Sequence, residues 1–275
     1  MSPSHSSSSD QSDDPLFPLF AGLYVALLVT APVMYAVSEL GVTESGPLYG
    51  AMLVTVTVVT GAGWWVVAAR EWVATRLGAT AGRWVPGIVG VATALAGLAS
   101  LGQAGVASAV AFFFGAGAMV LGGVLGVMAR TRHTAAVLDG ADRHCEFRAG
   151  WPEAARNRMV VVVVPLMIGG IAGFAWIYLG THSWLVTVAQ ALLPVGVTLL
   201  MCTEQREYTV TDVGLEHRMP VARQVFRWAA FTGYSRTDDA LVLHRPWRLD
   251  IRLALDDLGD PDAVEAAVAE YLRAT

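Results

Sequence analysis

Long uncharged apolar stretches alternate with short polar connections along the first three quarters of the chain. Six of these stretches are close to the ~20 residues that a helix needs to cross a bilayer core, so we predict six transmembrane helices. Because only Gly102 and Gln103 separate the third stretch from the fourth, a re-entrant pair is the alternative there. The stretches comprise residues 17–38, 47–69, 84–101, 104–129, 159–180 and 183–202.

The hydrophobic pattern changes after Arg206. Leu249, Ile251 and Leu253 alternate with charged residues, a period of two that is typical of a half-buried strand and that continues to Leu255. Turn-forming residues separate further short runs of β-branched, aromatic and aliphatic residues. We therefore predict additional strands at 208–211, 215–219, 221–228, 231–235 and 241–244.

The last element is predicted to be an amphipathic helix. Asp260 suits an N-cap and Pro261 suits the first helical position. Three- and four-residue spacing then gives one apolar stripe. Residues 203–275 thus predict a small α+β module, whose modest core favours packing against the cytoplasmic loops or a partner. The stripe consists of Val264, Ala267, Val268, Tyr271 and Leu272.

Residues 1–16 are rich in Ser and Asp, lack hydrophobic periodicity, and are predicted to be disordered. A signal peptide is not expected, because no basic segment precedes the first apolar stretch. The expected organisation is a disordered N-terminus at 1–16, a six-helix transmembrane domain at 17–202 with a loop at 130–158, and a module at 203–275. That loop is long enough to hold helical extensions of the fourth and fifth spans.

The basic residues predict the orientation of the chain in the membrane. All 18 are Arg, and none lies in the first, third or fifth connection. The segment between the second and third spans holds Arg70, Arg76 and Arg83, the loop 130–158 holds six more, and the tail holds nine. Since positively charged segments stay on the cytoplasmic side, both termini are predicted to be cytoplasmic in a multi-pass protein of the cell membrane.

Composition excludes several classes of protein. A hydrophobic fraction of 55% with 15% charged residues is too apolar for an ordinary soluble fold. The net charge of -5 and the absence of Lys do not suit a nucleic-acid binder. An acidic, Lys-free chain indicates either a GC-rich genome or adaptation to high salt, where negative charge maintains solubility.

The predicted spans contain no Asp, Glu, Arg, Lys or His, and their only amide is Gln190. Intramembrane ionisable residues usually mark proton relays and substrate sites, so a proton-coupled transporter and an intramembrane enzyme are both disfavoured. We predict no catalytic residue and no cofactor site. Glycine pairs, Gly122 with Gly126 and Gly169 with Gly173, predict close helix packing within the bundle, with self-association into a homo-oligomer as the alternative.

Metal binding is the other chemistry considered. The loop 130–158 holds His133, His144 and Cys145, and Cys202 is the last residue of the sixth predicted span. Adjacent His144 and Cys145 do not match the usual zinc-ligand spacings, so we predict no metal site and two reduced thiols on the cytoplasmic side. The loop carries a net charge of +2, which either favours contact with anionic lipid head groups or serves only as an orientation signal.

The tail resembles the bacterial and archaeal pleckstrin-homology-like domains. The resemblance lies in Tyr208-Thr-Val-Thr-Asp-Val-Gly-Leu215, in Phe226-Arg-Trp228 leading to Phe231-Thr-Gly-Tyr234, and in Asp239-Ala-Leu-Val-Leu243. It implies a bent antiparallel sheet closed by a C-terminal helix, without catalytic residues. The whole chain is similar to multi-pass haloarchaeal membrane proteins with such a tail, a group without an assigned function.

Two functions remain as expectations. The first is a non-enzymatic α-helical membrane bundle that presents the module for protein interaction, assembly or regulation, with a partner at the tail and the loop 130–158. The alternative is a channel or facilitator for a neutral or apolar solute, shaped by proline kinks and glycine-rich helices. Trp228 is interpreted as a core anchor on the strand face of Phe226, and a peptide-binding groove is the alternative.

Overall fold

The structure is a computed structural model that describes residues 15–42, 44–70, 72–100, 106–178, 196–197, 199, 205–219, 222–246 and 248–273. The chain divides into two compact units, Met1–Val137 and Leu138–Thr275. The predicted disorder of residues 1–14, Gln190 and most of the predicted sixth span lie outside the described residues. Within the described residues, five helices are long and apolar enough to cross a membrane.

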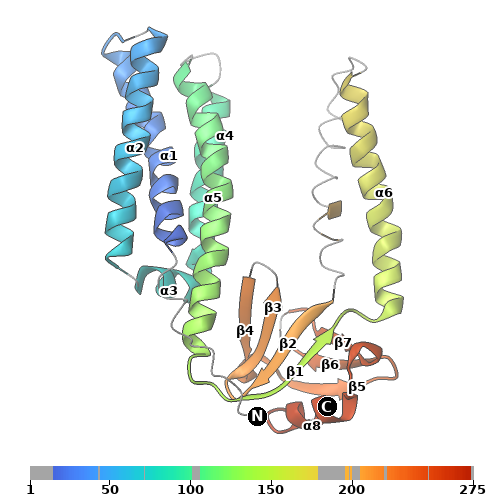
Figure 1. The fold of residues 1–275 in the computed structure, drawn as a ribbon. Coiled ribbons are helices and arrows are strands. Elements are labelled where there is room, and N and C mark those ends of the chain that lie inside the picture. The colour runs from blue at the N-terminus through green and yellow to red at the C-terminus, as the bar shows by residue number, and fades with distance from the viewer. Residues whose placement is uncertain are drawn as a thin grey trace, which may run out of the picture. The chain divides into compact units, whose positions relative to one another are not determined.

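The first unit is helical (Figure 1). Helix α1 packs against α2 and α5, α4 packs along α5, and the short α3 also contacts α5. The first four predicted spans are confirmed as helices of sufficient length and apolar composition. The elements are α1 (Leu16–Glu39), α2 (Ser45–Ala68), α3 (Trp72–Ala79), the 3-10 helix η2 (Ala81–Trp84), α4 (Val85–Ala99) and α5 (Val106–Val137).

Glycines bring α4 and α5 into backbone contact. A Cβ atom placed on Gly122 would lie 2.5 Å from the Gly87 nitrogen, and one on Gly90 would lie 2.2 Å from the Met119 nitrogen. A Cβ on Gly126 would likewise meet the Arg83 carbonyl oxygen at 2.7 Å. Gly122 and Gly126 therefore serve packing inside the bundle, as predicted.

Large apolar side chains point outward from these helices. On α2, Val54 is 63% exposed and Val58 is 62% exposed. Ile88 on α4 is 63% exposed. Phe113 on α5 is 67% exposed. Soluble monomers rarely expose apolar patches of such extent, whereas helices in contact with lipid do.

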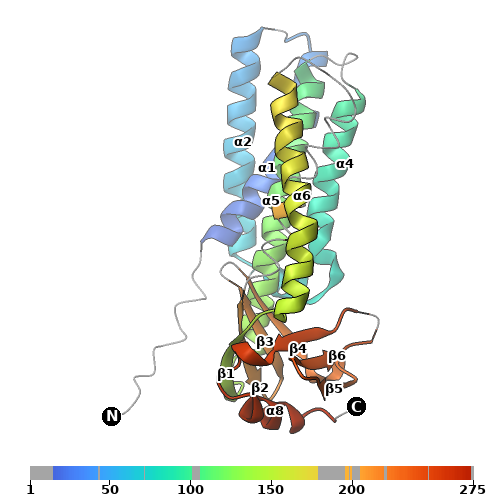
Figure 2. The ribbon, with the colours of Figure 1, turned by 90° about the vertical axis from the view of Figure 1, so that its right-hand side faces the viewer.

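The second unit combines one long helix with two antiparallel sheets (Figure 2). One sheet has the strand order β1-β2-β3-β4 and the other has the order β5-β6-β7. The elements are β1 (Arg143–Ala149), α6 (Glu153–Tyr178), β2 (Arg206–Thr211), β3 (Gly214–Met219), β4 (Ala222–Arg227), β5 (Gly233–Arg236), β6 (Ala240–His244), β7 (Ile251–Ala254) and α8 (Pro261–Ala269), with 3-10 helices η3 (Trp228–Ala230) and η4 (Leu255–Asp257).

Strand β1 is the main departure from the sequence-based expectation. The loop 130–158 does extend its flanking helices, since α5 continues to Val137 and α6 begins at Glu153. Between them, however, β1 pairs antiparallel with β2, with Phe147 opposite Tyr208 and Ala149 opposite Arg206. The C-terminal module is therefore completed by a strand from the loop between two long apolar helices.

The predicted strands of the tail are present with shifted ends. Strand β7 begins at Ile251, so Leu249 lies outside it and Leu255 belongs to η4. Trp228 begins η3 and is not on the β4 strand face that carries Phe226.

The module encloses one hydrophobic core between its sheets and α8. The predicted N-cap is confirmed, because Asp260 Oδ1 accepts a hydrogen bond from the Ala263 N–H at 3.0 Å. Helix α8 then lies against β1 (Figure 2) and buries Val264 and Val268. The core also contains Phe147, Tyr208, Val210, Leu215, Tyr234, Leu241, Leu243, Leu253 and Leu272.

Candidate interaction site

A ladder of rings crosses all four strands of the first sheet. Phe147 of β1 stacks on Tyr208 of β2, with ring centroids 5.8 Å apart. Tyr208 stacks on His217 of β3 at 4.9 Å, and His217 stacks on Phe226 of β4 at 6.2 Å. The Arg245 guanidinium closes the ladder 5.2 Å from the Phe226 centroid, within cation–π range. Strand β1 is thus joined to the strands of the tail by side-chain stacking as well as by backbone pairing.

His217 is the polar member of this ladder. It is 5% exposed. Burial, with a further contribution from the positive charge of Arg206, lowers the pKa of His217 to about 4. Its Nε2 lies 3.5 Å from Arg206 Nη1. The imidazole is consequently neutral at neutral pH, when it packs as an aromatic ring that also accepts from a guanidinium.

Ion pairs cross the strands on the opposite face of the same sheet. Glu216 is buried and its Oε1 accepts from Arg223 Nε at 2.8 Å and Nη2 at 2.6 Å. Arg148 of β1 donates to Glu207 of β2 at 2.6 Å. Opposite charges on neighbouring strands stabilise the pairing, so β1 is held by a charge pair in addition to its hydrophobic face.

Asp257 joins the two points at which the module connects to its flanking apolar segments. Its Oδ2 accepts from the Gly150 N–H at 2.8 Å, just before α6, and its Oδ1 accepts from Gln205 Nε2 at 2.7 Å, just before β2. The Ala254 N–H donates to the Gly150 carbonyl at 3.2 Å. One carboxylate from the tail therefore fixes the chain where it leaves the sheet and where it returns.

At the other end of β1, His144 joins an aromatic cluster. Its Nε2 lies 2.8 Å from the Tyr271 hydroxyl, and the Tyr271 ring stacks on Trp228 with centroids 4.9 Å apart. Trp228 Nε1 donates to the Thr211 carbonyl at 2.9 Å. These contacts support the interpretation of Trp228 as an anchor of the fold.

The described residues considered for metal binding lie on different elements, His133 on α5 and His144 with Cys145 on β1. His144 is engaged by Tyr271, His133 lies on α5 in the other unit, and Cys202 lies outside the described residues. Burial raises the pKa of the free Cys145 thiol. Among the described residues, no group of three or more His, Cys, Asp or Glu side chains is placed to hold a metal ion.

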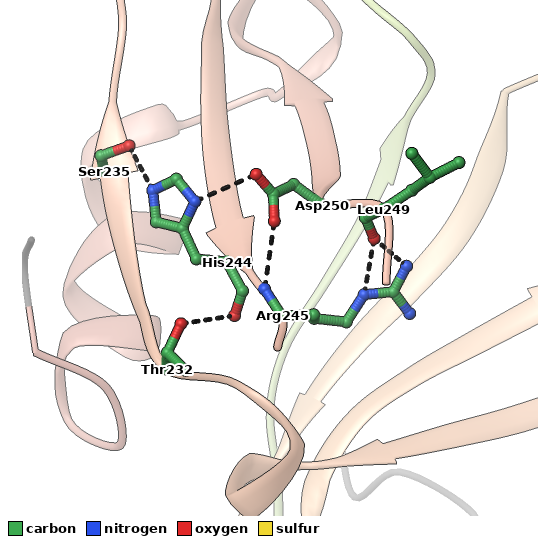
Figure 3. A network of polar contacts seen from close by, with 6 residues as sticks. All are labelled: Thr232, Ser235, His244, Arg245, Leu249 and Asp250. Carbon is green, nitrogen blue, oxygen red and sulfur yellow. Dashed lines mark hydrogen bonds and ion pairs between the residues drawn. The ribbon is translucent and has the colours of Figure 1, made fainter. Parts of the chain in front are cut away.

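The loop between β6 and β7 is fixed by a polar network (Figure 3). Asp250 Oδ1 accepts from the Arg245 N–H at 3.1 Å, and Oδ2 lies 3.1 Å from His244 Nδ1. The Arg245 N–H, with smaller contributions from His244 and Arg252, lowers the pKa of Asp250. His244 Nε2 is 2.8 Å from the Ser235 hydroxyl. An ionised Asp250 is only an acceptor, so His244 Nδ1 is the donor in that contact.

This Ser-His-Asp order is also that of serine hydrolases. Catalysis would need further donors aimed at a developing oxyanion beside the serine hydroxyl. In this network, the donors of Arg245 are directed elsewhere: its backbone N–H goes to Asp250, and its guanidinium donates through Nε and Nη2 to the Leu249 carbonyl, at 2.8 Å from Nε. The network links the described residues at the two ends of the loop, His244 and Arg245 on one side and Leu249 and Asp250 on the other.

The exposure of Leu249 follows from these contacts. Its backbone is fixed by Arg245 and by the neighbouring Asp250, while the residue is 84% exposed. The alternating pattern predicted an inward-facing Leu249 and was wrong there, because polar contacts of the loop override the period of two. The Pro246 turn former was the sequence signal that the strand begins later.

No protein-family model, no curated protein and no solved structure matches the chain.

Proposed function

We propose that the protein crosses the membrane six times and holds its C-terminal module on the cytoplasmic side, where the β6–β7 loop recruits a protein partner for assembly or regulation. The observation that carries the proposal is the fixed loop with an almost fully exposed Leu249. Binding energy at protein interfaces concentrates in a few anchor residues, and a preformed anchor loses little conformational entropy on binding.

The packing of the first unit supports four crossings. Phe17 at the start of α1 and Val67 at the end of α2 belong to one cluster with Ala74 of α3 and Ala129 near the end of α5. The Arg-containing segments of this unit therefore share one end of the bundle. Under the positive-inside rule, that end is cytoplasmic.

Strand pairing supports two more crossings. In the sequence, helix α6 and the apolar stretch 183–202 come between β1 and β2. These two strands are neighbours in one sheet. A chain that leaves a sheet on one side of a membrane and returns to it must cross an even number of times. A Cβ on Gly196 would lie 2.8 Å from Met167 Cγ of α6, so Gly196 lies beside that helix.

The pleckstrin-homology-like assignment of the module is also a proposal. It is supported by the division into a four-stranded and a three-stranded antiparallel sheet and by the closing helix α8. The tail 204–275 carries nine Arg against thirteen Asp or Glu, a net charge of -4, so we propose a protein as the module's partner.

Substitution of Leu249 tests the proposed function in the intact protein. Leu249→Asp should abolish co-purification of the partner after cross-linking in native membranes, because it places a charge at the apolar anchor. Ala229→Asp adds the same charge at another exposed position of the module and should leave the partner bound. The same set of co-purified proteins for Leu249→Asp and the unsubstituted chain, or none for either, would refute the proposal.

A further inference from the structure

Two arginine–tryptophan pairs lie on the segment that connects α2 to α4. The guanidinium carbon of Arg76 is 4.9 Å from the Trp72 ring centroid on α3, and that of Arg83 is 5.4 Å from the Trp84 ring centroid on η2. Trp72 is 55% exposed and Trp84 is 49% exposed. Both large rings thus face the surroundings of the bundle, each with a cation against it.

The segment sits at the end of the helices, where the membrane interface lies if they cross. Helix α3 packs against the last turns of α5, since a Cβ on Gly78 would lie 2.0 Å from the Ala129 carbonyl oxygen. Arg130 of α5 donates from Nη1 to the Gly78 carbonyl at 3.4 Å. The segment is therefore a fixed platform on the bundle.

The charge of the connecting segment is mainly positive. Residues 69–84 contain Arg70, Arg76 and Arg83 against the single acid Glu71, and no further Asp or Glu follows before Asp139. Tryptophan favours the boundary between acyl chains and head groups, and arginine favours phosphate. Anionic lipid complements both properties at once.

We infer that the α3–η2 platform binds the phosphates of anionic phospholipids, with Trp72 and Trp84 at the acyl boundary and Arg76 and Arg83 on the head groups. The inference rests on the proposed membrane position. A guanidinium stacked on a ring keeps its N–H edge directed outward, and that edge forms two parallel hydrogen bonds with a phosphate. Lysine preserves the charge but provides neither the planar stack nor the paired donors.

Lipid titration of the delipidated full-length chain in neutral detergent, followed by native mass spectrometry, tests the inference. Phosphatidylglycerol should bind more tightly than phosphatidylcholine. Each charged contact at a membrane surface is worth about a factor of five, so Arg76→Gln with Arg83→Gln should weaken phosphatidylglycerol binding about 25-fold. Arg76→Lys with Arg83→Lys should lose part of that affinity.

Arg236→Gln is the matched control, because Arg236 is paired with Asp262 and Glu265 on the C-terminal module. It should bind phosphatidylglycerol as the unsubstituted chain does. Equal binding of both lipids, or unchanged phosphatidylglycerol binding after the double glutamine substitution, would overturn the inference. Displacement of phosphatidylglycerol by millimolar inorganic phosphate would assign the site to free phosphate and would also overturn it. Alkaline extraction of membranes tests the membrane position separately.

Discussion

His217 ties the stability of the module to pH. Its pKa is about 4 in the fold, against 6.5 for a free histidine, so the unfolded chain takes up a proton first as the pH falls. The stability from the neutral imidazole is complete above about pH 6.5 and is lost towards pH 4, a loss on the order of 3 kcal/mol. Thermal unfolding followed by near-ultraviolet circular dichroism should show this decline.

His217→Phe is the control for that prediction. Phenylalanine keeps a ring between Tyr208 and Phe226 but does not titrate. The decline in melting temperature between pH 7 and pH 4.5 should therefore become shallower than in the unsubstituted protein. An identical decline in both proteins would show that His217 is not the group responsible.

Asp257 fixes the connection between the module and the apolar segments. Asp257→Ala removes the acceptor of the Gly150 N–H and of Gln205, which should cost about 2 kcal/mol of local stability. Hydrogen exchange of the Gly150 amide should accelerate accordingly. Asp256→Ala, at the exposed neighbouring position, should leave that exchange rate unchanged. Equal effects of the two substitutions would contradict the role of Asp257 in fixing Gly150 and Gln205.

At the scale of elements, α4 and α5 depend on close backbone approach. Gly122 and Gly123 are adjacent, yet a Cβ on Gly122 would lie 2.5 Å from the Gly87 nitrogen, whereas one on Gly123 has nothing within 4 Å. Gly122→Ala should thus destabilise the helix pair by about 2 kcal/mol, as overpacking does. Gly123→Ala should cost nothing. Thermal unfolding in detergent compares them, and equal melting temperatures would contradict this packing.

The elements that sequence predicted best are those with a local cause. The helices α1, α2, α4, α5 and α6 follow from apolar length alone, and the cap of α8 follows from Asp260 and Pro261. Strand β1 has a distant cause, because its partner β2 begins after α6 and the stretch 183–202. The alternation of Cys145, Phe147 and Ala149 was the available signal. It is too short to predict pairing with a particular strand.

The candidate site was less predictable than the fold. The contacts of Gly122 and Gly126 and the anchoring role of Trp228 were anticipated from residue type and spacing, although Trp228 lies on η3 and not on the strand face of Phe226. Other features depend on side chains that contact backbone groups elsewhere in the chain. The Asp257 carboxylate accepts from the Gly150 N–H, and the contacts between Arg245, Leu249 and Asp250 leave Leu249 exposed. Hydrophobic periodicity carries no information about such contacts, and here it assigned Leu249 to the wrong environment.

At the scale of the whole molecule, β1 makes the module inseparable from the rest of its unit. A fragment of residues 203–275 would expose the unpaired edge of β2 and the Tyr208 ring, and exposed edges promote aggregation. We expect that fragment to aggregate on size-exclusion chromatography. Fusing residues 138–152 before residue 205 through a flexible linker should yield a monomer. A monomeric, well-folded 203–275 fragment would show that β1 is dispensable.

The pairing of β1 with β2 is the central claim, and a disulfide tests it most directly. Native Cys145 lies opposite Val210, whereas Val225 of β4 is three strands away, about 14 Å at the usual strand spacing. In a Cys202→Ser background, Val210→Cys should form a disulfide with Cys145 under mild oxidation in intact membranes, seen as a linked peptide by mass spectrometry, and Val225→Cys should not. Absence of the Val210→Cys disulfide, or equal yields from both variants, would contradict the shared sheet.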